Sequence, residues 1–191
     1  ECFSGDSIVE TFEGPKRMRE VKTGDEVLSI EESMISFSPI IMFLHRDEQL
    51  MAQFNIIDTA NGASVKLTDE HLIYVSDCDP STPLRLIKAK EVTTDHCLMT
   101  ALSPDRTLDI HPVTNVTQIS ERGVYAPLTS TGDIIVNDIL SSCHSNVAVR
   151  TLQLSFFSLY RTLSFFLPDQ NSLLFGLEYL ITTVDLFIPV K

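Results

Sequence analysis

Along most of the chain, apolar and β-branched residues gather in short runs separated by turn-forming pairs such as Asn61-Gly62 and Gly132-Asp133. No stretch before residue 147 keeps the 3.6-residue period of an amphipathic helix, so the pattern predicts an all-β domain over residues 2–146. The expected strands are 7–12, 26–30, 35–43, 52–58, 64–67, 72–76, 97–101, 123–126 and 133–137.

Residues 147–191 follow a different pattern, in which large apolar side chains crowd two segments on either side of Pro168-Asp169-Gln170-Asn171. This pattern predicts a helical hairpin. We do not expect either segment to span a membrane, because Arg161, Glu178 and Asp185 interrupt them and charges are costly at the bilayer centre. Two interpretations remain: a helix pair that covers the β domain, and a helix pair that docks on a lipid or membrane surface.

Two stretches of the β region resemble two others, in the same order and at similar spacing, which predicts a duplicated β unit folded about a pseudo-two-fold axis. The matched segments are 21–29 with 92–100 and 67–75 with 128–136. In the second match, Thr68 and His71 of the first copy correspond to Thr129 and Gly132. Because a duplicated fold needs one active centre, His71 is the expected functional residue and Gly132 a structural turn.

Charge and composition exclude some functions. A formal net charge of −12 argues against nucleic acid as a partner, because phosphates require a basic face. The apolar share of 43% is enough for a sizeable core. Residues 1–10 have neither the basic start nor the apolar run of a signal peptide. By contrast, Asn115-Val116-Thr117 is a glycosylation acceptor triplet, which is usable only in a secreted protein.

The cysteines are too sparse for a disulfide scaffold and lack the close pairs of a zinc site, so we expect no metal and no cofactor. They are Cys2, Cys78, Cys97 and Cys143. Cys78 and Cys97 are interpreted as ordinary core residues. Three of the five histidines, His96, His111 and His144, are interpreted as structural or exposed.

Cys2 is poorly placed to pack a core, because chain ends fray, but it is well placed to attack the peptide bond before it. Such an attack converts an amide into a thioester. The departing amide nitrogen must be protonated, and imidazole is suited to that task. Thr68 and His71 lie three residues apart at a strand edge or turn, so both are expected to reach one scissile bond, with Thr68 donating or orienting.

At this point several motifs, taken in order, resemble those of a known family. They are CFSGDS at 2–7, TGDEVL at 23–28, LTDEHL at 67–72, GVYAPLT at 123–129 and SSC at 141–143. Together they resemble the Hint (Hog) autoprocessing domain of Hedgehog proteins and of the Hedgehog-related proteins of nematodes, over residues 2–146. The resemblance implies a horseshoe-shaped all-β fold shared with inteins and built from duplicated subdomains.

The resemblance also implies a reaction. Cys2 performs an N-to-S acyl shift at the Glu1–Cys2 bond, with Thr68 and His71 activating the amide. A sterol hydroxyl then attacks the thioester and releases an upstream signalling domain, encoded in the same chain, as a sterol ester. The resemblance further implies a developmental protein of cell–cell signalling that is processed in the endoplasmic reticulum and secreted.

Two further parts carry over by resemblance. Cys143 matches a cysteine that pairs with the nucleophile during folding in some members, which would fit a secretory compartment. Residues 147–191 match the sterol-recognition region in position and character. The aromatic residues that would form that region are Phe156, Phe157, Phe165, Phe166 and Phe175.

The chain departs from the family at two positions. The sterol-activating aspartate of a Phe-x-Asp-Arg context is replaced by His45 in Phe43-Leu44-His45-Arg46. Imidazole acts as a general base near neutral pH, so a sterol, another alcohol or water remains open as acceptor. Asp47, two residues on, would share a strand face with His45 and orient it. Glu1 stands where the family usually has glycine and would slow the attack.

Three functions therefore remain open. The leading one is self-cleavage with transfer to a sterol or other nucleophile, through Cys2, Thr68, His71 and His45. The second is intein-like thioester hydrolysis without transfer; full splicing is excluded because residues 185–191 lack the His-Asn ending that cyclisation requires. The third is a non-catalytic sterol- or lipid-binding module, in which Cys2 is a buried or disulfide-bonded thiol and His45 faces solvent without a role.

Overall fold

The computed structural model describes residues 2–31, 33–79, 81–102 and 107–144. The predicted helical hairpin of residues 147–191, with its five phenylalanines, lies outside the described residues and stays a prediction. The described part is almost entirely β, which confirms the predicted fold class. Within it, no helix has the length and apolar composition to cross a bilayer.

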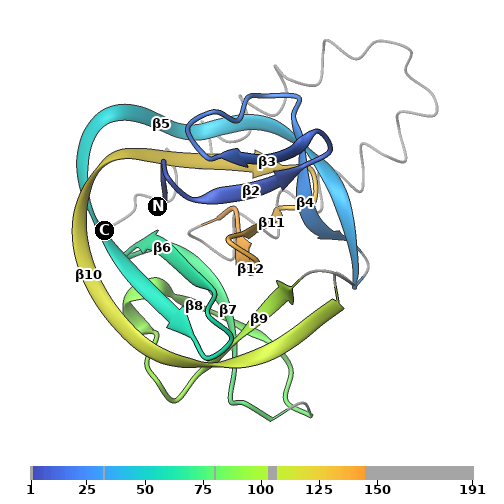
Figure 1. The fold of residues 1–191 in the computed structure, drawn as a ribbon, viewed down its shortest axis with the longest axis vertical. Coiled ribbons are helices and arrows are strands. Elements are labelled where there is room, and N and C mark those ends of the chain that lie inside the picture. Colours follow the sequence, from blue (N-terminus) through green and yellow to red (C-terminus); the bar gives the residue numbers. More distant parts are fainter. Residues whose placement is uncertain (1, 32, 80, 103–106, 145–191) are drawn as a thin grey trace, which may run out of the picture. The chain divides into compact units, whose positions relative to one another are not determined.

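Twelve strands and one short 3₁₀ helix, η1, make up the described part of the chain (Figure 1). The strands are β1 (Phe3–Ser4), β2 (Ile8–Thr11), β3 (Gly14–Arg17), β4 (Glu26–Glu31), β5 (Met34–Thr59), β6 (Ser64–Thr68), β7 (Leu72–Ser76), β8 (Arg85–Lys88), β9 (Cys97–Leu102), β10 (Thr107–Thr129), β11 (Asp133–Val136) and β12 (Ile139–Ser142), with η1 (Ala89–Glu91) after β8.

Two long strands, β5 and β10, form the frame of the domain. They pair antiparallel from Val113 opposite Thr59 to Thr129 opposite Ile40, and Figure 1 shows them curving together in one wide arc. The register shifts at several points along this pair, and such bulges bend strands. The predicted strands 35–43 and 52–58 are therefore parts of one continuous strand.

The curvature of β5 and β10 brings the start of the chain into a ring of pairings. β6 pairs with β5 and, through Leu67 opposite Phe3, with β1; β1 in turn pairs with β10 through Phe3 opposite Tyr125. Cys2 immediately precedes β1. Its side chain packs in one buried cluster with Phe54, Val124 and Ala126, so the predicted nucleophile lies within the domain rather than at a frayed end.

The two halves of the described region repeat each other. Glu26 of β4 lies opposite Pro39 of β5, and Cys97 of β9 lies opposite Pro112 of β10. The contacts between halves are reciprocal. The amide of Ala60, after β5, donates to the Pro112 carbonyl at 2.9 Å, and the amide of Ser130, after β10, donates to the Pro39 carbonyl at 3.2 Å. These relations confirm the predicted duplication.

The predicted correspondence of His71 with Gly132 is wrong in register. Thr129 and Gly132 form the turn after β10, and the equivalent turn after β5 is formed by Thr59 and Gly62. In each turn the glycine amide donates to the threonine carbonyl, at 3.2 and 3.0 Å, and the glycine φ is positive, at 78° and 87°. The turn at His71 follows the next strand, β6. The sequence match paired the wrong turns because each of the three turns follows a strand that ends in threonine.

Cys78 and Cys97 form a disulfide, so their interpretation as ordinary core cysteines is wrong. The pairing follows from topology, because β7 and β9 pair with Ser76 opposite Cys97 and Cys78 lies two residues beyond Ser76. Cys97 is buried and Cys78 is exposed. A second buried cluster, separate from that of Cys2, fills the space among β4, β9, β11 and β12 with Leu28, Ala101, Ile135 and Leu140.

Candidate active site

Cys2 and Thr68 are joined by two hydrogen bonds. The backbone nitrogen of Cys2 donates to the Thr68 hydroxyl oxygen at 2.7 Å, and the Thr68 amide donates to the Cys2 carbonyl at 3.1 Å. Cys2 is 2% exposed. The nitrogen held by Thr68 is the one that would leave in an attack on the preceding peptide bond. Of the two roles predicted for Thr68, the geometry therefore favours orienting that nitrogen.

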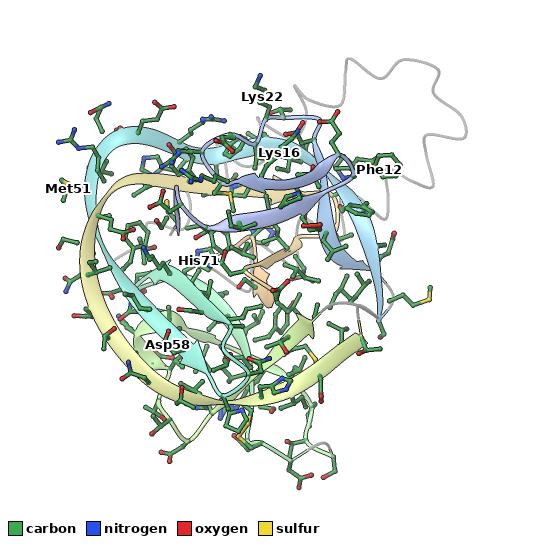
Figure 2. The ribbon with its side chains drawn as sticks, viewed as in Figure 1. Phe12, Lys16, Lys22, Met51, Asp58 and His71 are labelled. Atoms are coloured by element: carbon green, nitrogen blue, oxygen red, sulfur yellow. A yellow bond between two sulfur atoms is a disulfide. The ribbon has the colours of Figure 1, made fainter. Side chains whose placement is uncertain are left out.

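His71 lies next to this pair and is 1% exposed. Its backbone nitrogen donates to the Thr68 carbonyl at 3.0 Å, and its ring contacts that of Phe3 edge-on, with centroids 4.4 Å apart. Figure 2 shows the side chain inside the body of the domain. The residue that follows Cys2 thus supports the histidine, which ties the two predicted site residues to one local structure.

The protonation of His71 follows from its partners. Its Nε2 lies 2.8 Å from the Ser142 carbonyl, which only accepts, so Nε2 carries the proton and donates. Nδ1 has no hydrogen-bond partner among the described residues and is available to exchange a proton. Burial lowers the pKa of His71 to about 3, against the opposing effect of the Ser142 carbonyl. The imidazole is therefore neutral near pH 7, and its protonated form is a strong acid.

The end of β12 contributes the rest of the site. The Cys143 amide donates to the Gly132 carbonyl at 2.9 Å, and its sulfur lies 3.5 Å from the Thr129 hydroxyl. Cys2 and Cys143 are both buried and both carry thiols. The structure shows no disulfide between these two described residues, and their pairing during folding stays a prediction.

His144 was interpreted as structural or exposed, and it is buried at 3% exposure beside the site. Its carbonyl accepts the amide of Leu72, the residue after His71, at 3.3 Å. A positive charge on its ring would contribute to lowering the pKa of His71, behind burial. Sequence reasoning missed this neighbour because a single histidine after Ser-Ser-Cys carries no spacing signal of its own.

His45 lies across the sheet from Cys2. In β5 it is exposed and stands opposite Ala126 of β10, and Ala126 packs against Cys2. Phe3 lies between Leu67 of β6 and Tyr125 of β10. Continuing these antiparallel pairings by one residue places Cys2 between Thr68 and Ala126. The row Thr68, Cys2, Ala126, His45 therefore crosses four strands on one face, with His45 two strands, or about 10 Å, from Cys2. Ala126, which is 5% exposed, lies between them in this row.

Arg46 fixes the strand that carries His45. Its guanidinium donates to the carbonyls of Val21 and Arg19, both at 2.8 Å. It also lies over the rings of Phe43 and Tyr125, at 4.8 and 5.6 Å from the centroids. Sequence reasoning did not assign Arg46 this role. Phe43 lies three residues before Arg46 in β5, but Tyr125 belongs to β10. The position of the cation between the two rings is therefore evident only once β5 and β10 are paired.

Asp47, predicted to orient His45, uses its carboxylate within β5, at the register shift between Asp47 and Met51. Its Oδ1 accepts from the amides of Gln49 and Leu50, at 2.8 and 3.1 Å. Elsewhere, His96 accepts from the Thr93 amide at 3.0 Å, and His111 lies 2.9 Å from the Thr100 hydroxyl. In the described ranges, no group of three or more His, Cys, Asp or Glu residues is placed to hold a metal ion.

Comparisons with known proteins agree with this arrangement. Residues 1–172 match a family model described as the Hint module. Warthog protein 6 of Caenorhabditis elegans is 48% identical over 99% of the chain, and Indian hedgehog B protein of Danio rerio is 32% identical over 99% of it. The chain spans 33% of the length of the first relative and 50% of the second.

Solved inteins have the same fold. A DnaB intein from Synechocystis has a TM-score of 0.62 at 14% identity, with 74% of this chain and 96% of that chain covered. The gp41-1 intein has a TM-score of 0.58 at 17% identity, with 74% and 97% covered. At such identities the likeness concerns the fold alone.

Proposed function

The chain belongs to the Hint module family, in the branch of Hedgehog and Warthog proteins, and on this premise we propose that it cleaves its own precursor at the Glu1–Cys2 bond. The observation that carries the proposal is the 2.7 Å hydrogen bond from the Cys2 nitrogen to Thr68, within one turn of buried His71. A site that holds a backbone nitrogen on a hydroxyl, with a buried neutral histidine in the turn that follows that hydroxyl, is suited to acyl transfer at that nitrogen.

In the first step the Cys2 thiol gives its proton to Nδ1 of His71, and the sulfur attacks the carbonyl carbon of Glu1. The carbon–nitrogen bond breaks, and the proton passes from Nδ1 to the departing nitrogen of Cys2. The products are a thioester and an amine on Cys2. Because burial lowers the pKa of His71 to about 3, the imidazolium does not accumulate: Nδ1 takes the thiol proton as the sulfur attacks and gives it up as the carbon–nitrogen bond breaks. Thr68 holds the nitrogen throughout.

In the second step an alcohol takes over the acyl group. The imidazole of His45 accepts the hydroxyl proton, the alcohol oxygen attacks the thioester carbonyl, and the carbon–sulfur bond breaks. The sulfur of Cys2 leaves as a thiolate, and the upstream segment is released as an ester. The acceptor would approach the thioester from the side of exposed His45, across Ala126. A sterol is the acceptor we propose, held by the phenylalanines of residues 147–191.

Hydrolysis is the second candidate for this step, and the exposure of His45 favours it. An exposed imidazole is reached by water as well as by an alcohol, and attack by water would release the upstream segment as a carboxylic acid. A purely lipid-binding role would leave the contacts among Cys2, Thr68 and His71 without a purpose, so we place it last.

The partner and the compartment follow from the same proposal. Relatives two to three times as long as this chain are consistent with an upstream signalling domain in the same polypeptide, on which the module acts in cis. The Cys78–Cys97 disulfide supports passage through the secretory pathway, because disulfides persist in oxidising compartments. We therefore propose processing in the endoplasmic reticulum.

The test fuses a small reporter upstream of Glu1 and follows the precursor by intact mass. Incubations with dithiothreitol, with cholesterol and with neither are compared, and Cys2→Ala serves as control. Thiol-dependent release that requires Cys2 is the expected result, with a reporter heavier by one esterified sterol in the second incubation. A reporter ending in a carboxylate would favour hydrolysis. Equal release from the Cys2→Ala precursor would refute the proposed thioester.

A further inference from the structure

A carboxylate beside the site joins the two strands that hold Cys2 and Thr68. Glu121 of β10 accepts from the Ser4 hydroxyl with Oε2 at 2.8 Å and forms an ion pair with Lys66 through Oε1. Ser4 belongs to β1 and is 1% exposed, and Lys66 belongs to β6. The side chains of Lys66 and Glu121 are 26% and 21% exposed, so the ion pair is partly shielded from water. Neither step of the proposed reaction uses these groups.

The strand register puts this carboxylate bridge next to the reacting pair. Phe3 lies opposite Leu67, so Ser4 lies opposite Lys66 just as Cys2 lies opposite Thr68. Residues two apart on a strand point to the same face, about 7 Å apart. The bridge therefore fixes the separation of β1 and β6 on the face that carries Cys2 and Thr68, two residues along each strand from that pair.

The short β1 needs such a tie. It is two residues long and is held to β6 by the pair Phe3 and Leu67. Strands this short have little stability of their own. Charge-assisted hydrogen bonds are roughly twice as strong as neutral ones, and this one connects β1 to β10 and β6 together.

We propose that Glu121 is a positioning residue for the first step, acting through Ser4 and Lys66 to keep the Cys2 sulfur and nitrogen in place against Thr68 and His71. The inference rests on the proposed function and adds a part to it. Misplacement by about 1 Å costs up to about a hundredfold in rate. The second step starts from a thioester that is already formed, so loss of the bridge should slow thioester formation and leave the choice of acceptor unchanged.

The test uses the reporter precursor and measures the rate of thiol-dependent release. Glu121→Ala and Ser4→Ala should each slow release by about tenfold. The double variant should be no slower than the slower single variant, because both changes remove the same link. Glu121→Gln, which still accepts from Ser4 but loses the charge, should fall between Glu121→Ala and the parent. The ratio of ester to acid formed with cholesterol present should not change.

Lys16→Met is the matched control, because it removes ion pairs with Glu13 at 2.9 Å and Asp25 at 3.4 Å from β3, a strand that pairs with β2 rather than with β1 or β6. It should release the reporter at the parental rate. Parental rates in Glu121→Ala, additive losses in the double variant, or a loss that follows only the melting temperature would each overturn the inference while the proposed function stands. A parent precursor that fails to cleave would overturn both.

Discussion

The Cys2 nitrogen and the Thr68 hydroxyl lie 2.7 Å apart, with the nitrogen as donor and the oxygen as acceptor. Thr68 therefore contacts the nitrogen that would leave in the proposed first step. In the proposed reaction it would keep that nitrogen oriented for protonation while the carbon–nitrogen bond lengthens. The proposed roles differ, since Thr68 would orient the nitrogen and His71 would move the proton, so the contribution of each residue is measurable.

Replacement of Thr68 tests this contact. Thr68→Ala should slow thiol-dependent release by about a hundredfold, because the departing nitrogen loses its acceptor. Thr68→Ser keeps the hydroxyl and should stay within a few-fold of the parent, whereas Thr68→Val, equal in shape but without the hydroxyl, should behave like alanine. Release rates from the reporter precursor give the comparison. A fully active valine variant would show that shape alone matters at this position.

The buried neutral state of His71 makes stability depend on pH. Its folded pKa of about 3 lies below the ordinary value of 6.5, so below pH 6.5 the unfolded chain binds a proton that the folded chain does not. Stability should therefore fall as the pH drops from about 6.5 toward 3, with a slope of about 1.4 kcal/mol per pH unit from this group. Denaturant titrations of Cys2→Ala with and without His71→Gln isolate the effect. Identical slopes would contradict it.

His45 should matter for the second step alone. His45→Ala should leave thiol-dependent release near the parental rate, because Cys2, Thr68 and His71 are untouched, and should reduce ester formation with cholesterol at least tenfold. His45→Asp supplies the carboxylate that the family has at this position and should restore ester formation. Intact mass of the released reporter distinguishes ester from acid. A His45→Ala variant that still forms the ester would remove this histidine from the mechanism.

Asn115 should carry a glycan if the domain passes through the endoplasmic reticulum. Its side chain and that of Thr117 are exposed and, two residues apart on β10, point to the same face. The side-chain nitrogen would bond to the anomeric carbon of a lipid-linked oligosaccharide, with release of the lipid pyrophosphate. Expression in a secreting eukaryotic cell should give a band that an N-glycosidase shifts and that Asn115→Gln and Thr117→Ala abolish. Absence of any shift would count against the proposed compartment.

The Cys78–Cys97 disulfide should stabilise the domain by about 3 kcal/mol, given the 19 residues that separate its cysteines. The Cys78→Ser, Cys97→Ser double variant should therefore unfold at lower denaturant concentration. Because Cys78 is exposed, dithiothreitol is expected to reduce this bond as well as trap the thioester. Hydroxylamine, which cleaves thioesters without reducing disulfides, separates the two effects. A double variant as stable as the parent would show that the bond adds little.

Much of the fold was predictable from the residue pattern. The strands that were missed are those that become strands through pairing with a neighbour rather than through a local pattern. The run 72–76 has β-branched residues between clear turns, and β7 has the bounds predicted for it. The middle of β5 was missed because residues 44–50 are all exposed, so no alternation of apolar and polar residues marks them as strand. β3 was missed because Gly14–Arg17 contains glycine, proline and two cations, and only its pairing with β2 makes it a strand.

The site divides in the same way. Cys2, Thr68 and His71 were predicted from their chemistry and spacing, and the structure brings the three residues together, while their roles stay predictions. The buried position of His144 and the disulfide of Cys78 depend on which strands become neighbours, and no local pattern carries that information. The same holds for Glu121, which looks like an ordinary surface residue until β1 lies beside β10.

The insertion of β1 between β6 and β10 also sets an order in time. A ribosome makes Cys2 well before the residues that activate it, from Thr68 and His71 to the Ser142 carbonyl. A nascent or truncated chain carries the nucleophile but not the machinery that makes it react. If the proposed function holds, cleavage waits until the β domain has been synthesised and β1 has paired with β6 and β10. An upstream segment released by this reaction would therefore come only from precursors whose β domain had been completely synthesised.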